Sequence, residues 1–341
     1  KIKMSQTIDI KTKKIIPQQE HKFDKTLVLE HLERNILSHW DTWGKFQQAW
    51  TSRALRAFND LDKYLVLIYL IKGSWQNLSD KFQYLSMDEY YGLDFVKIDK
   101  INLIQISKDL NIPKETIRRK VNELQSANLL KREGKSIIFN RQGIETQKPK
   151  NSIDLLSTFI EKKSKMLQGQ EWFGEPLSKD FIKSFIKKYF TIIWLRFFKM
   201  QIPFLVRHRK VFEDLETWIV WGNIALSHQY HLAKAAEKNL VIEPITLKSY
   251  YSNVADVKIL RGINASSIAD ISRIPRATVI RKLKWLVKQD CIKKNKNLEY
   301  QMKKGGKLNT KISENFLLNQ HSVAEFLTDI FDLMKNSEFK L

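Results

Sequence analysis

The chain has 341 residues, 43% of them hydrophobic, and a formal net charge of +22 at pH 7. That length and apolar content are enough for two globular units and exclude a chain that stays unfolded for lack of a core. The single cysteine excludes a disulfide framework and a cysteine-based zinc site. The positive charge favours a polyanionic partner; a generic basic surface is the alternative.

No membrane span or signal peptide is expected. The most apolar run, residues 190–206, is interrupted by Arg196, Lys199 and Pro203, which makes a membrane-spanning helix unfavourable. We therefore expect a cytoplasmic protein, associated with the nucleoid if its partner is DNA.

The chain begins with a lysine-rich stretch, residues 1–22, whose lack of periodicity predicts a flexible basic arm. Apolar spacing then predicts helices over 27–37, 40–57 and 58–71, with Asp60 as an N-cap. A short helix is expected over 152–161.

The next prominent feature, here called the first motif, runs from Ile106 to Asn140. A helix should begin at Pro113, because proline fits the first turn of a helix. One face of that helix is apolar and should face a core: Ile117, Val121 and Leu124. A strand, a polar turn at 132–135 and a second strand should follow.

A second motif, Ile268 to Met302, repeats this pattern. Its helix should begin at Pro275, and its polar turn lies at 294–297. The apolar face again repeats at spacings of four and three: Val279, Leu283 and Leu286. Ten of the 32 positions from 101 to 132 are identical to those from 263 to 294, which indicates a duplication.

The repeat extends beyond the two motifs. Trp40, Lys45 and Gln47 recur as Trp194, Lys199 and Gln201, and residues 90–91 and 96–98 recur at 250–251 and 257–259. Residues 154–156 resemble 325–327 in the last helix, where Ser322 and Glu325 form a capping-box pattern. We therefore predict two units, 23–168 and 177–341, joined by a linker at 169–176.

The two motifs resemble the winged helix-turn-helix family of transcription regulators. Pro-Arg-Ala-Thr-Val-x-Arg-Lys-Leu at 275–283 is similar to the recognition helix of IclR-type DNA-binding domains. Residues 113–121 are the corresponding segment of the first motif. The resemblance covers about 80 residues and implies a mainly α fold with two tandem winged helix-turn-helix units in a pseudo-two-fold arrangement. It also implies that the helix after each proline enters the DNA major groove and that each hairpin wing touches phosphates.

The candidate DNA-binding residues follow from this reading. The exposed helix faces carry Lys114, Glu115, Thr116, Arg118, Arg119 and Asn122 in the first motif, and Arg276, Ala277, Thr278, Arg281, Lys282 and Lys284 in the second. The wings add Lys131, Arg132, Lys135, Lys293, Lys294 and Lys296. Ile280 stands where the first motif has Arg118, at a position that should be exposed.

Charge is concentrated in the two motifs. Residues 101–141 hold nine Lys/Arg against four Asp/Glu, and residues 263–304 hold eleven against three. Together these stretches carry +13 of the net +22. Arg118, Arg119 and Arg281 are the best candidates for guanine edges, whereas Thr116 and Thr278 suit phosphate or a local cap.

The predicted helical segments that precede each motif are rich in aromatic side chains: Trp40, Trp43, Trp50, Trp194, Phe197, Phe198 and Phe204. We expect them to fill a core; an effector pocket and an interface between the two units are the alternatives. These helices or the last helix could also join two copies in a homodimer. No metal, cofactor or catalytic motif is predicted, and any effector is unknown.

The leading hypothesis is a sequence-specific double-stranded DNA-binding transcription regulator, not an enzyme. Its two helices differ, so the two half-sites should differ as well. A plasmid- or phage-type replication initiator, an architectural nucleoid protein and a scaffold that binds only proteins are the alternatives. Burial of either basic helix would remove the basis of the leading hypothesis.

Overall fold

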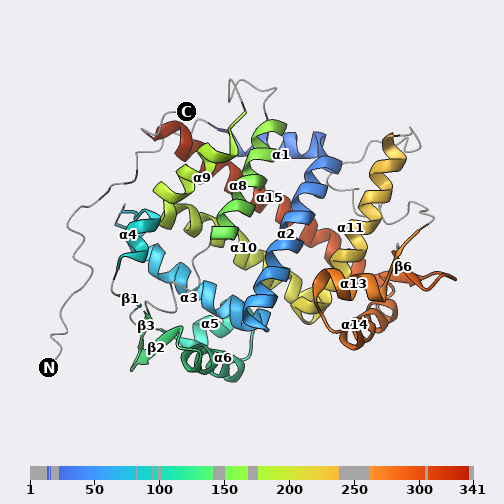
Figure 1. The fold of residues 1–341 in the computed structure, drawn as a ribbon, viewed down its shortest axis with the longest axis horizontal. Coiled ribbons are helices and arrows are strands. Elements are labelled where there is room, and N and C mark those ends of the chain that lie inside the picture. The colour runs from blue at the N-terminus through green and yellow to red at the C-terminus, as the bar shows by residue number, and fades with distance from the viewer. Residues whose placement is uncertain are drawn as a thin grey trace.

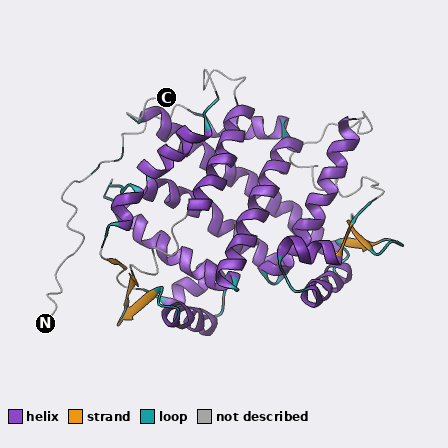
Figure 2. Cartoon of the chain, in the orientation of Figure 1, coloured by secondary structure: helices purple, strands orange, loops and turns teal. Residues whose placement is uncertain are grey.

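The computed structural model describes residues 14, 16, 23–81, 83–93, 95–98, 101–140, 150–167, 176–237, 261–303 and 306–337. Most of the basic arm, most of the linker and the recurring residues 250–251 and 257–259 lie outside this set. The described chain is mainly helical with two small antiparallel sheets, which confirms the expected fold class at that level (Figures 1 and 2).

The first half of the described chain, residues 23–167, contains one three-stranded sheet, with helices before it, after it and between its first two strands. Its elements are α1 (Lys25–Arg34), α2 (Ile36–Phe58), α3 (Leu61–Ser79), α4 (Met87–Tyr91), β1 (Phe95–Ile98), α5 (Leu103–Leu110), α6 (Lys114–Ser126), β2 (Leu130–Glu133), β3 (Ser136–Asn140) and α8 (Lys150–Met166).

The second half, residues 176–337, follows nearly the same order. Its elements are α9 (Lys179–Lys188), α10 (Phe190–Phe212), α11 (Leu215–Glu237), β4 (Ile263–Asn264), α13 (Ala265–Ser272), α14 (Arg276–Lys288), β5 (Ile292–Lys294), β6 (Glu299–Met302) and α15 (Gly306–Asn336). Helices α2 and α10 are both 23 residues long, and α1 and α9 are both 10 residues long.

Local signals place several of these helix boundaries. The predicted N-cap Asp60 is confirmed, since its carboxylate accepts a hydrogen bond from the Lys63 amide at 2.9 Å. The predicted helix over 27–37 is interrupted at Asn35, where α1 ends and α2 begins. The capping box at Ser322 is wrong: Ser322 lies inside α15, and its hydroxyl donates to the Leu318 carbonyl one turn earlier.

Between the two halves, α3 packs on α10 and α2 packs on α11, and side chains of α2 and α10 meet around an internal pseudo-two-fold axis. Gln47 and Gln201, 154 residues apart, donate to each other reciprocally at 2.8 Å, and both are buried. Trp43 packs on Phe204 at 5.4 Å between ring centroids, and its symmetry-related contact joins Trp50 and Phe197 at 4.5 Å. Such paired contacts define an isologous interface, here within one chain.

The last helix of each half packs on the first helix of the other half. Helix α8 packs on α9, and α15 packs on α1. Matching ion pairs mark the two contacts: Lys179 with Asp154 at 3.0 Å, and Lys25 with Glu325 at 3.1 Å. The buried side chains of both halves consequently form one hydrophobic cluster.

The aromatic side chains named in the sequence analysis are buried in this cluster, except Trp40, which is partly buried and packs against it; their contacts lie between the halves as well as within them. Core packing and the inter-unit interface, treated as alternatives from the sequence, therefore describe the same contacts. Within the described residues, no single helix has the length and apolarity to cross a membrane. Helices α9 and α10 would meet that test only together, and they are bent by 102°.

Candidate nucleic-acid interface

Each motif contains two short helices joined by a tight turn of the same geometry. Asn102 caps α5 and Asn264 caps α13, each accepting a backbone hydrogen bond from the first turn. Both first helices end in a left-handed residue, Asn111 with φ 51° and Arg273 with φ 62°. This shared turn sets the direction in which α6 and α14 leave it.

The two prolines are N-caps of the second helices rather than their first residues. Pro113 and Pro275 have ψ values of 138° and 133°, so α6 begins at Lys114 and α14 at Arg276. The expected helix starts are therefore confirmed to within one residue. An extended proline ends the turn before a helix without leaving an amide hydrogen unpaired.

A hairpin follows each second helix and pairs with an earlier strand. The strand orders are β1-β3-β2 and β4-β6-β5, all antiparallel. The first turn is Gly134-Lys135, with Gly134 at φ 60°. The second spans Asn295–Leu298, one residue later than expected, because Asn295 accepts hydrogen bonds from the amides of Asn297 and Glu299.

Fifteen of the eighteen predicted contact residues are exposed. Thr116 and Thr278 are half-buried, and Lys282 is buried. Ile280, expected to be exposed, is half-buried. In Figures 1 and 2, α6 and α14 lie along the same edge of the molecule, and the two sheets lie farther out at its opposite ends.

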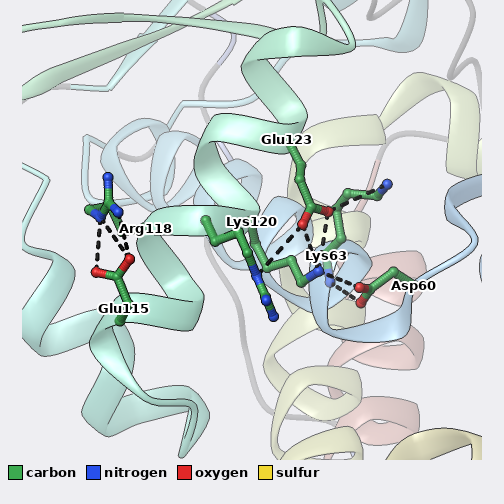
Figure 3. Close-up of polar contacts among 7 residues, drawn as sticks. Asp60, Lys63, Glu115, Arg118, Lys120 and Glu123 are labelled. Atoms are coloured by element: carbon green, nitrogen blue, oxygen red, sulfur yellow. Dashed lines mark hydrogen bonds and ion pairs between the residues drawn. The ribbon is translucent and has the colours of Figure 1, made fainter.

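The assignment of Lys282 to the exposed face is wrong. It follows Val279 by three residues and therefore lies on the apolar side of α14. Lys282 is only 8% exposed, and its ammonium pairs with Asp214 at the start of α11. Its counterpart Lys120, 6% exposed, pairs with Asp60 at 2.5 Å (Figure 3).

These buried lysines join the second helix of each motif, α6 or α14, to the helices packed behind it. Burial lowers the pKa of Lys120, but hydrogen bonds to Asp60 and Glu123 outweigh this effect and leave the pKa above its ordinary value. Partial burial raises the pKa of Asp60, but hydrogen bonds from Lys120 and from the Lys63 amide, together with the charge of Lys120, bring that pKa below its ordinary value. Both groups are therefore held in their charged forms, and the pair fixes α6 against α3.

The exposed faces of the two helices differ in charge. On α6, the guanidinium of Arg118 donates to Glu115, with Nε to Oε2 at 2.9 Å, and Arg119 lies 3.8 Å from Glu123 (Figure 3). On α14 these acids are absent, and Arg281 has no hydrogen bond or ion pair with any described residue. The face of α14 is therefore the more strongly positive of the two.

The wings are basic but partly self-paired. Lys131 contacts Glu133 at 2.9 Å, and Arg132 donates to the Gly134 carbonyl at 3.0 Å. Lys294 lies over the Tyr300 ring, 5.8 Å from its centroid. All three side chains are exposed and can exchange these contacts for phosphates at small cost.

Sequence reasoning missed the residues that orient the first motif from outside it. Arg209 of α10 donates to both carboxylate oxygens of Asp62, at 2.8 and 3.0 Å, and to the Asn111 carbonyl at 2.9 Å. The role of Lys120 was readable, since it falls in the apolar stripe of α6. That of Arg209 was not, because nothing local connects α10 to the turn after α5.

No family model matches this chain, and neither the curated proteins nor the solved structures contain a significant match. The functional argument therefore depends on the geometry of the two motifs.

Proposed function

We propose that this protein is a sequence-specific double-stranded DNA-binding regulator of transcription built from two tandem winged helix-turn-helix units. The observation that carries the proposal is the placement of two exposed, basic helices along one edge of the molecule, related by an internal pseudo-two-fold axis. DNA readers of this type place their second helix in the major groove and use two-fold symmetry to reach two half-sites.

The order of elements supports the same assignment. In each motif a capped helix, a tight turn, a basic helix and a hairpin follow one another, as the resemblance to the winged helix-turn-helix family implies. Apart from the buried Lys120 and Lys282, the basic side chains of α6 and α14 are exposed, whereas the apolar stripe of each helix is buried. Phosphate contacts from the wings would position the protein, and side chains on α6 and α14 would read bases.

The two helices present different side chains, so the two half-sites should differ. Selection from random duplex DNA should return a pseudo-palindrome with unequal halves. A perfect palindrome would show that the two halves read DNA equivalently and would overturn the asymmetric arrangement.

The affinity of the selected site should depend steeply on salt. Engagement of about six to ten phosphates predicts a loss of roughly 10³–10⁵-fold in affinity between 50 and 200 mM salt. Fluorescence anisotropy with the selected and a scrambled duplex at each salt concentration measures both the slope and the specificity. Equal affinity for the two duplexes would favour an architectural protein, and no affinity at 50 mM salt would exclude a DNA-binding role.

A further inference from the structure

The first half contains a cavity that the DNA-binding proposal does not use. Its volume is about 240 Å³, and it lies between α2, α3 and α10 on one side and the first motif on the other. Leu129 and Phe139 of the first motif form part of its wall. An apolar cavity of roughly 150 Å³ accepts benzene, so this one has room for a larger aromatic molecule.

The pseudo-symmetric position in the second half is almost filled. The equivalent space there has a volume of about 20 Å³, enough for roughly one water molecule. Its walls include Trp40, Phe204 and Trp218, which correspond to Trp194, Trp50 and Tyr64 in the first cavity, 154 residues away in each pair.

Two substitutions between the halves contribute to the difference. His208 stands where the first half has Ala54, and its ring packs against Phe204 at 4.1 Å and Trp218 at 5.2 Å between centroids. Trp221 likewise stands where the first half has Leu67. The smaller Ala54 and Leu67 side chains therefore leave room in the first half that His208 and Trp221 occupy in the second.

Several polar side chains of the cavity have donors that no described residue engages. Arg53 lines it without a hydrogen bond or ion pair to any described residue. The Nε1–H of buried Trp194 has no partner among the described residues. The Tyr64 hydroxyl accepts from Trp50 at 2.7 Å but donates its own proton to no described residue. Burial raises the pKa of Tyr64 and keeps that hydroxyl protonated. No Asp or Glu lies among the described lining residues.

From these observations we infer that the first-half cavity binds a small aromatic carboxylate, with its rings among the aromatic walls and its carboxylate at Arg53. Aromatic faces and edges favour a flat aromatic ligand. A carboxylate would supply the acceptors that Arg53, Trp194 and Tyr64 lack, and bonds between charged groups are the stronger ones. This binding does not depend on the DNA-binding proposal.

Calorimetric titration of the full chain with 2-naphthoate, and with uncharged 2-naphthamide, tests the inference. Wild type should bind one 2-naphthoate with a dissociation constant of about 10–1,000 µM, the range expected for a ligand of this size. Ala54→Leu and Ala54→His narrow the cavity as His208 does in the second half, and each should weaken binding by about tenfold or more. Circular dichroism checks that both variants fold, and Ala57→Val provides a milder third variant.

The charge is tested by a matched pair of arginines. Arg53→Gln should weaken 2-naphthoate by about tenfold while leaving 2-naphthamide within about twofold, because only the carboxylate loses a charged partner. Arg207→Gln, at the equivalent position of the second half, should leave both affinities unchanged. No binding of either compound, two sites per chain, or unchanged affinity in a folded Ala54→Leu protein would each overturn the inference.

Discussion

The two halves share a helical framework but differ at several positions that face solvent or a cavity. Their common features are the helix lengths, caps and left-handed turns of the two motifs, and the buried lysine on α6 and on α14. Their differences are the acids on α6, which α14 lacks, and the open cavity beside α2, which its counterpart fills. The residues that position α6 and α14 are thus similar in the two halves, whereas the residues that would contact ligands differ.

The dependence of stability on pH is the first test of this comparison. It depends on two buried histidines, His39 and His208, whose counterparts in the other half are not histidines. Burial lowers the pKa of His208 to about 3 and that of His39 well below 6.5, in the latter case with a further effect of Lys163. Below pH 6.5 the unfolded chain therefore binds more protons than the folded one, and stability falls as pH falls. Each histidine should cost about 1.4 kcal/mol per pH unit, or about 4 kcal/mol for the pair at pH 5.

Urea unfolding at pH 7 and pH 5 measures this loss. His208→Ala, which gives the second half the residue of the first, should reduce the pH dependence by about one proton while lowering stability at both values. A free energy of unfolding that does not change between pH 6.5 and pH 5 would contradict the assignment of neutral buried histidines.

Replacing one arginine in α6 or in α14 should change the base preference at one half-site and not at the other. Arg281→Ala should relax selection at one half-site by roughly 1–3 kcal/mol, and Arg119→Ala should relax the other by less, because Glu123 already engages Arg119. Binding to a panel of single-base variants of the selected site reads this out. Lys45→Ala removes the same charge from α2 and serves as control; a uniform loss over the whole panel would make the arginines phosphate contacts.

The buried lysines offer a matched test of stability. Lys120→Met should lower the free energy of unfolding by about 2 kcal/mol, because it removes the Lys120 ammonium from the partly buried carboxylates of Asp60 and Glu123. Lys282→Met should cost about 1 kcal/mol, since Asp214 is more exposed than Asp60 and can be solvated.

Chemical denaturation at pH 7 gives both values, with Lys108→Met on exposed α5 as a control expected within about 0.5 kcal/mol of wild type. A larger loss for Lys282→Met than for Lys120→Met would reverse the proposed order of the two contacts.

The smallest effect is expected from making α6 resemble α14. Glu115→Ala introduces the alanine found at position 277, frees Arg118 and removes a negative charge from the proposed DNA face. Non-specific affinity should rise about two- to fivefold at 50 mM salt, and the gain should shrink as salt increases. Anisotropy with a scrambled duplex measures it; weaker binding would show that Glu115 positions Arg118 productively.

Local signals accounted for much of the fold. The N-cap at Asp60, the two helix starts after proline and the hairpins were readable, because caps, turns and apolar spacing act over a few residues. The crossing of α8 and α15 between halves was not, since a helix's apolar face does not specify which surface covers it. At the candidate interface, sequence identified the exposed cations but misplaced Lys282, whose partner Asp214 lies 68 residues away.

The exchanged closing helices have a consequence for synthesis. Helix α1 is completed by α15, which emerges from the ribosome about 280 residues later, so a nascent first half has an uncovered apolar face throughout translation. Contacts of such sequence separation also slow folding, because the intervening chain must be ordered first. Because the two halves belong to one chain, however, α6 and α14 remain together at any dilution.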